Sequence, residues 1–439
     1  MTLKKIFSSH PLLKKIFNHS SVLFSGQIVF TLFGIGSLVI TARVLGAEKL
    51  GILTLIQTTV FIISSILIPK PWLTIVRFGA TLEKRKKFQE FKSLIRISFT
   101  IEVCFAILAG FLTLLLAPYI LDLISVKKEY SQLFVIYILT LFLNITGTSI
   151  GLLRHYDEVT WIRNIEMATG GIKFILVFLG FLLGLRLYYF VISYAFSEVF
   201  KFIATNIIGY FVSYRKKYKG VQLDKFFIKF DEFKEALNFG VSMHFNDLLG
   251  TARREFDLVV IGALLNPQSV GYYKVIKQFS KMFTLLGNPL KQAVYPHICK
   301  LWADNKVKLF IKTQLQVIGI LLIIFTVIGL NFWLFSDVAV QMLFGGEYMP
   351  IVTPLNLYIA FSALFIAFQI LNSAVLAKGM GGKALMVEAI TNVVYFLLIF
   401  LLVPSYELFG VIYAFSGSIF VWILLFGYYS FYDFKVLKQ

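Results

Sequence analysis

The sequence predicts an all-α membrane protein with twelve transmembrane helices, arranged as two six-helix halves around a central cleft. Of its 439 residues, 58% are hydrophobic and only 15% are charged, whereas a soluble domain carries about 25% charged residues. The mean hydropathy is +0.81. The apolar residues come in runs of about 20, the length of helix that spans a hydrocarbon core.

Twelve such runs follow one another along the chain. They lie at about 19–44, 50–69, 95–117, 131–153, 164–184, 187–212, 236–262, 270–299, 313–335, 351–375, 384–403 and 408–431. The longest gaps, 70–94 and 213–235, are highly charged and are predicted to be extramembrane segments. Neither gap is long enough for a soluble domain.

The distribution of basic residues predicts that both termini lie in the cytoplasm. With that orientation, 29 of the 42 Lys and Arg residues fall on the inner side and only five on the outer side. Lys and Arg are enriched in cytoplasmic loops, so the formal charge of +19 predicts topology and no nucleic-acid partner. The basic segment 1–18 contains "LKKIF" twice, which suits either contact with anionic membrane lipids or a plain topological anchor.

An internal repeat divides the chain into halves. "ARVLGAEKLGILTL" (42–55) and "GALLNPQSVGYYKV" (262–275) align so that Gly51 matches Gly271 at an offset of 220 residues. We therefore expect an N-terminal half, 1–212, a cytoplasmic linker, 213–235, and a C-terminal half, 236–439. With six helices each, both halves have the same orientation, which predicts an axis along the membrane normal and a cleft between them.

Four motifs carry a resemblance to a known family: "ARVLGAEKLG", "GLLRHYDEV" (151–159), "FDLVVIGALLNPQSVGYY" (256–273) and "LFGGEY" (343–348). In this order and spacing the chain resembles the polysaccharide transport family of the multidrug/oligosaccharidyl-lipid/polysaccharide exporter superfamily, which includes the O-antigen repeat-unit flippases. The resemblance implies a multi-pass protein of the inner or plasma membrane. It also implies a flippase that carries an undecaprenyl-diphosphate-linked oligosaccharide from the cytoplasmic to the outer leaflet by alternating access, for cell-surface polysaccharide biosynthesis.

No covalent chemistry and no cofactor follow from this resemblance. A coupling Na⁺ or H⁺, and contact with polysaccharide polymerase machinery, are compatible with it. The related lipid II flippases usually have fourteen helices, whereas this chain has twelve apolar runs.

Charged residues inside the predicted seventh and eighth helices suggest where the substrate binds. Together these helices hold six basic residues, against Asp247, Glu255 and Asp257. Charges at membrane depth are costly and usually face a cavity or a ligand, and a diphosphate is an anion that Arg can bind through two nitrogens. The predicted substrate-binding residues are Arg254, Arg253, Lys277, Lys281, Lys274 and, in the first half, Lys173. Alternatively, Arg253 and Asp257 form a structural ion pair and Lys274 reaches the headgroups.

Embedded acidic residues are the candidates for ion coupling: Asp257, Glu102, Glu166 and Glu388. Glu198 and Lys201, three residues apart, are expected to pair. His244 is expected to make a hydrogen-bonded helix contact and not to serve as a proton relay. Cys104 and Cys299 have no neighbour at metal-ligand spacing, and no metal site is expected.

Two other functions compete with the flippase. A cation-coupled multidrug exporter of the same superfamily would need net negative charge in its cleft, the opposite of the charge on helices seven and eight. A membrane enzyme of polysaccharide assembly would need larger outer loops, and no catalytic motif stands in a suitable setting.

Overall fold

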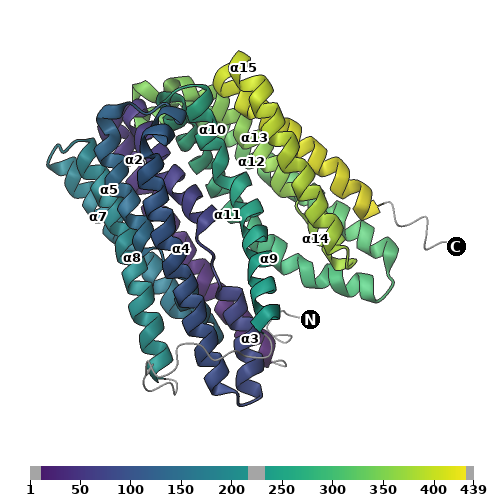
Figure 1. Ribbon diagram of the computed structural model, residues 1–439. Coiled ribbons are helices and arrows are strands. Elements are labelled where there is room, and N and C mark those ends of the chain that lie inside the picture. The colour runs from purple at the N-terminus through teal and green to yellow at the C-terminus, as the bar shows by residue number, and fades with distance from the viewer. Residues whose placement is uncertain (1–10, 216–232, 432–439) are drawn as a thin grey trace. The chain divides into compact units, whose positions relative to one another are not determined.

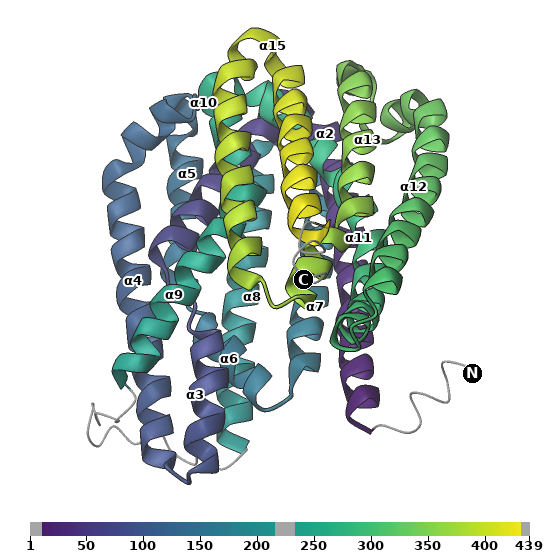
Figure 2. The same ribbon diagram turned by 90° about the vertical axis from the view of Figure 1, so that its right-hand side faces the viewer.

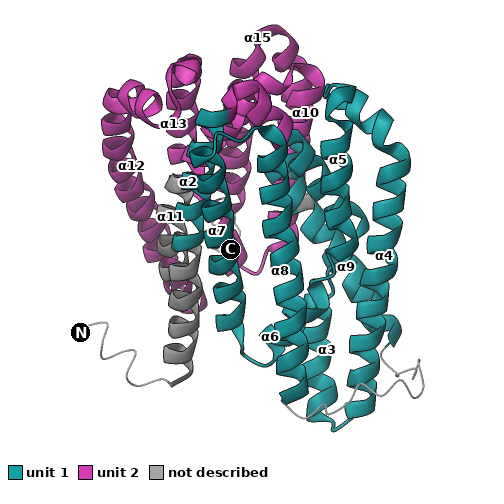
Figure 3. Cartoon of the chain, turned by 90° about the vertical axis from the view of Figure 1, so that its left-hand side faces the viewer, with its two compact units in different colours: residues 1–44, 55–256 teal, residues 45–54, 257–439 magenta. Residues whose placement is uncertain are grey.

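The computed structural model describes residues 11–215 and 233–431, which form helices, turns and short connections with no strand among them (Figure 1). Side chains within these ranges are described except for 11–28, Leu249, Arg253 and 282–293. Contacts divide the chain into two units, coloured separately in Figure 3. Unit 1 comprises 1–44 and 55–256, and unit 2 comprises 45–54 and 257–439.

The first described helix is interrupted. Helix α2 (Pro11–Leu67) contains a break at Gly46, whose φ of 74° is favourable only for glycine. It is followed by α3 (Trp72–Lys84), α4 (Phe88–Leu123), η1 (Lys128–Tyr130), α5 (Ser131–Ile138), η2 (Leu139–Leu143) and α6 (Gly147–His155). Unit 1 then continues through α7 (Val159–Leu182), α8 (Leu187–Arg215), α9 (Phe233–Thr251) and the π-helical turn η3 (Ala252–Phe256).

The segment 70–94, a predicted gap between spans, is mostly helical in the structure. Pro69 and Pro71 lack the backbone N–H groups that would continue α2, but helix resumes in α3. Ile75, Phe78 and Leu82 lie at helical spacing, are buried, and pack in one cluster with Phe91 and Leu94 of α4. Figure 2 shows α3 and α4 side by side.

Unit 2 contains the described helices that follow η3, together with residues 45–54 of α2. These are α10 (Asp257–Leu264), α11 (Pro267–Ala303), α12 (Val307–Phe344), η4 (Gly346–Ile351), α13 (Val352–Phe368), α14 (Ile370–Ala377) and α15 (Gly381–Phe431). Helix α15 is broken at Glu407. Its C-terminal part buries Trp422 and Phe426 in a core with Ile370 and Leu371 of α14 and Phe310 of α12.

The motifs of the internal repeat meet inside unit 2. Beyond the break at Gly46, the carboxylate of Glu347 accepts a hydrogen bond of 2.8 Å from the N–H of Ala47 and so caps the new helix. The hydroxyl of Tyr272 donates to the carbonyl of Glu347 at 3.1 Å. Three of the four family-like motifs therefore build one joint between α2, α11 and η4.

Seven described helical segments are long and apolar enough to cross a membrane, or eight if the bent pair Lys128–Leu143 and Gly147–His155 counts as one span. Two of the seven, Val29–Lys84 and Gly381–Phe431, contain the breaks at Gly46 and Glu407 and so have room for two predicted spans each. Among the described residues, α9 to α11 contribute no segment to this set. The all-α membrane fold is confirmed, and the count of twelve stays a prediction.

Candidate functional site

Glu102 of α4 holds the break in the predicted fourth span. Its side chain is fully buried and accepts hydrogen bonds from the N–H groups of Gly147 at 2.6 Å and Thr148 at 2.8 Å, and from the Thr148 hydroxyl. The first N–H groups of a helix have no partner within it, and its N-terminus favours negative charge. Glu102 therefore caps α6 from a neighbouring helix, while its predicted role in ion coupling stays a prediction.

Lys70 is a residue that the sequence reasoning missed, because it was placed in a cytoplasmic loop. It lies between Pro69 and Pro71 in the break between α2 and α3, where the backbone passes close to Gly147. Its charge acts within electrostatic range of Glu102, Asp247, Lys201 and Arg254. The apolar residues after Pro71 recur at helical spacing. That spacing could have indicated that Lys70 lies at a break between two helices.

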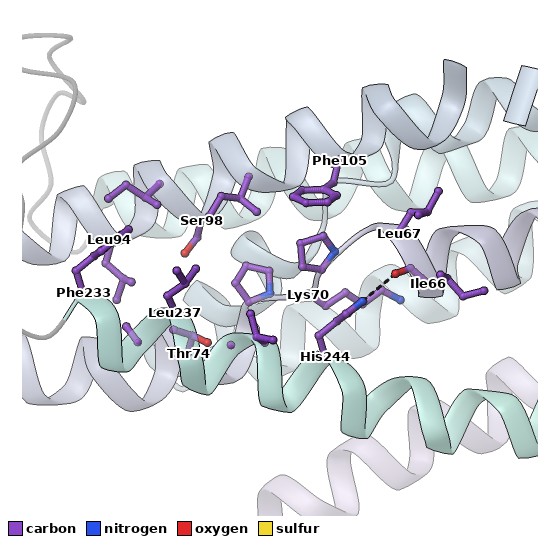
Figure 4. Close-up of a pocket in the computed structure, with 17 residues that line it drawn as sticks. Ile66, Leu67, Lys70, Thr74, Leu94, Ser98, Phe105, Phe233, Leu237 and His244 are labelled. Atoms are coloured by element: carbon purple, nitrogen blue, oxygen red, sulfur yellow. Dashed lines mark hydrogen bonds between the residues drawn. The ribbon is translucent and has the colours of Figure 1, made fainter. Parts of the chain in front are cut away.

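His244 of α9 makes the helix contact expected from the sequence. Its Nε2 donates to the carbonyl oxygen of Ile66 at 3.0 Å, the dashed line in Figure 4. Ile66 lies in the last turn of α2 before the proline break, where a helix leaves carbonyl groups without intrahelical partners. The imidazole therefore ties α9 to the broken end of α2.

The remaining predicted site residues of unit 1 lie in α7 and η3. Arg254 is exposed within the π-helical turn, and its guanidinium donates to the Thr251 hydroxyl at 3.4 Å; such turns are frequent at functional sites. The Lys173 ammonium lies 5.6 Å and 5.4 Å from the ring centroids of Phe30 and Tyr194. The side chain of Arg253 lies outside the described residues.

Two acidic residues of unit 1 interact with basic partners. Glu166 of α7 is half-buried, within electrostatic range of Lys201 and Arg154. The predicted pair between Glu198 and Lys201 is confirmed at 3.8 Å.

Asp257 and Lys277 form a buried ion pair in unit 2. The Lys277 ammonium donates to both carboxylate oxygens, at 2.9 Å and 3.1 Å. The hydroxyls of Tyr273, at 2.8 Å, and Tyr395, at 3.2 Å, donate to the second oxygen. The carboxylate thus links α10, α11 and α15, and the tyrosines are further residues that the sequence reasoning missed.

The other predicted residues of unit 2 have different environments. Lys274 is half-buried and Lys281 is exposed. The carboxylate of Glu388 accepts hydrogen bonds from the Trp422 indole at 3.0 Å and from Asn372 at 3.4 Å. Of the predicted site residues, the structure brings Asp257 and Lys277 into direct contact, and it places Arg254 in one unit and the three α11 lysines in the other.

A family model described as "Polysaccharide biosynthesis protein" matches residues 16–302, well over half of the chain. The chain belongs to this polysaccharide biosynthesis family. This chain is also 27% identical over 204 residues to the capsular polysaccharide biosynthesis protein CapF of Staphylococcus aureus. That match covers 46% of this chain and 50% of CapF, so it spans about half the length of the curated relative.

Solved structures share the fold of this polysaccharide biosynthesis protein. The lipid II flippase MurJ, in an inward closed conformation, aligns with a TM-score of 0.68 and 14% identity over 95% of this chain and 87% of MurJ. An inward-facing multidrug resistance MATE transporter of the MOP superfamily aligns with a TM-score of 0.67 and 16% identity over 93% of this chain and 96% of that chain. The resemblance read from the four motifs is confirmed. The protein is a multi-pass membrane protein that shares the fold of these solved transporters.

Proposed function

We propose that the protein is a flippase that moves a polyprenyl-diphosphate-linked oligosaccharide from the cytoplasmic to the outer leaflet of the cell membrane. The observation that carries the proposal is the combination of a polysaccharide biosynthesis family with a fold that a lipid flippase also has. In this proposal the substrate crosses the membrane with its sugars and diphosphate attached. The proposed activity is transport by alternating access and involves no covalent chemistry.

The intramembrane cations support an anionic substrate. Arg254 and Lys281 are exposed within their units. The Lys277 ammonium donates to the Asp257 carboxylate. A diphosphate compensates cations at membrane depth, and the planar guanidinium of Arg254 suits two phosphate oxygens. In this proposal Arg254 and Lys281 contact the diphosphate, and Lys277 positions α10 against α11.

A reconstitution experiment tests the activity. The full chain is placed in liposomes with a fluorescent, short-chain polyprenyl-diphosphate disaccharide, and dithionite added outside bleaches the outer leaflet only. A flippase makes the inner-leaflet pool accessible, so bleaching proceeds beyond the level seen in protein-free liposomes. Bleaching that stops at the protein-free level contradicts the proposal.

The same liposomes separate the flippase from the multidrug exporter. An exporter accumulates or releases an organic cation such as ethidium when a Na⁺ or H⁺ gradient is imposed. Ethidium transport without movement of the lipid-linked sugar would favour the exporter. The MATE likeness, at 16% identity, concerns the fold alone and does not decide between them.

A further inference from the structure

A pocket of about 390 Å³ lies inside unit 1, beside the break that contains Lys70 (Figure 4). Its walls come from the end of α2, the proline break, α3, α4 and α9. Apolar side chains dominate the lining, among them Leu67, Leu94, Ile101, Phe105, Leu237 and Val241. The volume is near the lower end of the range for small-ligand sites, about 300 to 1,000 Å³, and suits one hydrocarbon chain better than two.

A helix break and several small side chains leave the space that forms this pocket. The break at Pro69 to Pro71 removes helical backbone between α2 and α3, and Ser98, Ala236 and Gly240 contribute little volume. The hydrogen bond from His244 to Ile66 holds α9 against the end of α2 beside this space. The walls are therefore fixed by packing, helix breaks and a hydrogen bond.

The pocket also has a positive charge. Lys70 lines it together with His244. Among the described residues, the contact found for the Lys70 ammonium is the ring of Phe61, 5.8 Å from its centroid, and no hydrogen bond or ion pair is found. The neighbouring acid Glu102 is already occupied by three donors from α6. An ammonium at membrane depth favours an anionic partner.

An apolar pocket with a cation at its wall matches a hydrocarbon chain that ends in a phosphate. We propose that this pocket binds the phosphate-proximal part of a polyprenyl chain, with Lys70 contacting the phosphate to which that chain is attached. This inference rests on the proposed function and assigns a place to the lipid part of the substrate. Arg254, which the proposed function assigns to the diphosphate, is within electrostatic range of Lys70.

The test uses a photoreactive analogue of farnesyl diphosphate, a short isoprenoid, with the purified full chain in phosphatidylcholine nanodiscs. Cross-linked peptides are mapped by mass spectrometry. We expect labelling on α4 and α9 around Phe105 and Leu237. Lys70→Gln should weaken labelling about tenfold, which corresponds to a loss of about 1.4 kcal/mol in binding free energy. Lys70→Arg should retain most of the labelling. Lys49→Gln, an exposed lysine of α2 outside the pocket, is the matched control and should not change labelling.

A second pair of variants tests the apolar wall. Leu237→Trp fills the pocket and should reduce labelling, whereas Phe245→Trp, on an exposed position of the same helix outside the pocket, should not. Labelling that maps elsewhere, or that is insensitive to both Lys70→Gln and Leu237→Trp, overturns the proposal. So does complete competition by phosphatidylglycerol in the nanodisc, which would identify an ordinary phospholipid site.

Flipping measured on the same variants separates this inference from the proposed function. Normal flipping without labelling of α4 and α9 rejects the pocket and leaves the flippase standing. Labelling without flipping by the unmodified protein supports the pocket as a prenyl-phosphate site and rejects the flippase.

Discussion

Gly51 and Gly271, which occupy equivalent positions in the two sequence repeats, pack directly against one another in unit 2. A Cβ on Gly51 would lie 1.6 Å from the carbonyl oxygen of Pro267, and a Cβ on Gly271 would lie 2.0 Å from the carbonyl oxygen of Ala47. At these distances the backbones of α2 and α11 touch, and no side chain other than hydrogen fits. The repeated glycine is thus the point where the two repeats meet.

The first prediction concerns this crossing. Gly51→Ala and Gly271→Ala should each lower the free energy of unfolding. Overpacking a core costs about 1 to 3 kcal/mol, and we expect at least this loss because backbone, and not a flexible side chain, must move. Gly427→Ala, in α15 with open space around it, should be neutral or slightly stabilising. Thermal unfolding of the purified variants measures both. Equal melting temperatures for all three variants would show that the helices do not cross at these glycines.

A second prediction concerns the pair of Asp257 and Lys277. Removing one member leaves a buried charge, so Asp257→Asn and Lys277→Met should each cost about 3 to 5 kcal/mol. The double variant should recover part of that loss because no charge is left alone. A double-mutant cycle on unfolding free energy gives the coupling energy. If Lys277→Met instead left stability unchanged and abolished flipping, Lys277 would be a substrate contact, as the sequence suggested.

The third prediction separates structural from ion-coupling carboxylates. Glu102 and Glu388 are held by hydrogen-bond donors, so Glu102→Gln and Glu388→Gln should lower stability, each by about 1 to 3 kcal/mol. Glu166 is within electrostatic range of Lys201 and Arg154, and Glu166→Gln should change the dependence of flipping on a Na⁺ or H⁺ gradient with a smaller effect on stability. Unaltered gradient dependence in Glu166→Gln would remove it from the candidates.

The fourth prediction tests topology. With Cys104 and Cys299 replaced by Ser, Gln268→Cys should react with a membrane-impermeant maleimide added outside intact cells, and Gly220→Cys should react only after permeabilisation. Gly220 lies outside the described residues, so its side of the membrane follows from the basic residues alone. The opposite labelling pattern would invert the orientation.

The fifth prediction returns to Arg254 and Lys281. Arg254→Ala and Lys281→Ala should lower surface polymer while membrane levels of the protein stay normal. Lys281→Arg should retain more activity than Lys281→Gln, since charge matters there, whereas Arg254→Lys should be impaired because an ammonium lacks the guanidinium fork. Normal surface polymer from the double alanine variant would exclude a diphosphate site at these residues.

The all-α membrane fold could be predicted from the length and composition of the apolar runs, because a hydrocarbon core requires long apolar helices. The Lys and Arg residues between the runs predict the orientation. Local signals also specified particular residues. The spacing of Glu198 and Lys201 predicted their pairing, and the repeat identified Gly51 and Gly271 as equivalent. The helical run after Pro71 was present in the sequence, but 70–94 was predicted only as a highly charged gap between spans.

The partners of the embedded charges were decided by tertiary structure alone. On helical spacing Asp257 could pair with Arg253, but α11 brings Lys277 and Tyr273 to the same carboxylate, and α15 adds Tyr395 from 138 residues away. Glu102 meets the N-terminus of α6 through contacts between residues 45 and 46 positions apart. Sequence determines how much charge lies at membrane depth, since each span must be apolar enough to cross. The partner of each charged group depends on which helices pack around it. For this reason Lys277 pairs with Asp257, whereas Lys70 lies beside an apolar pocket.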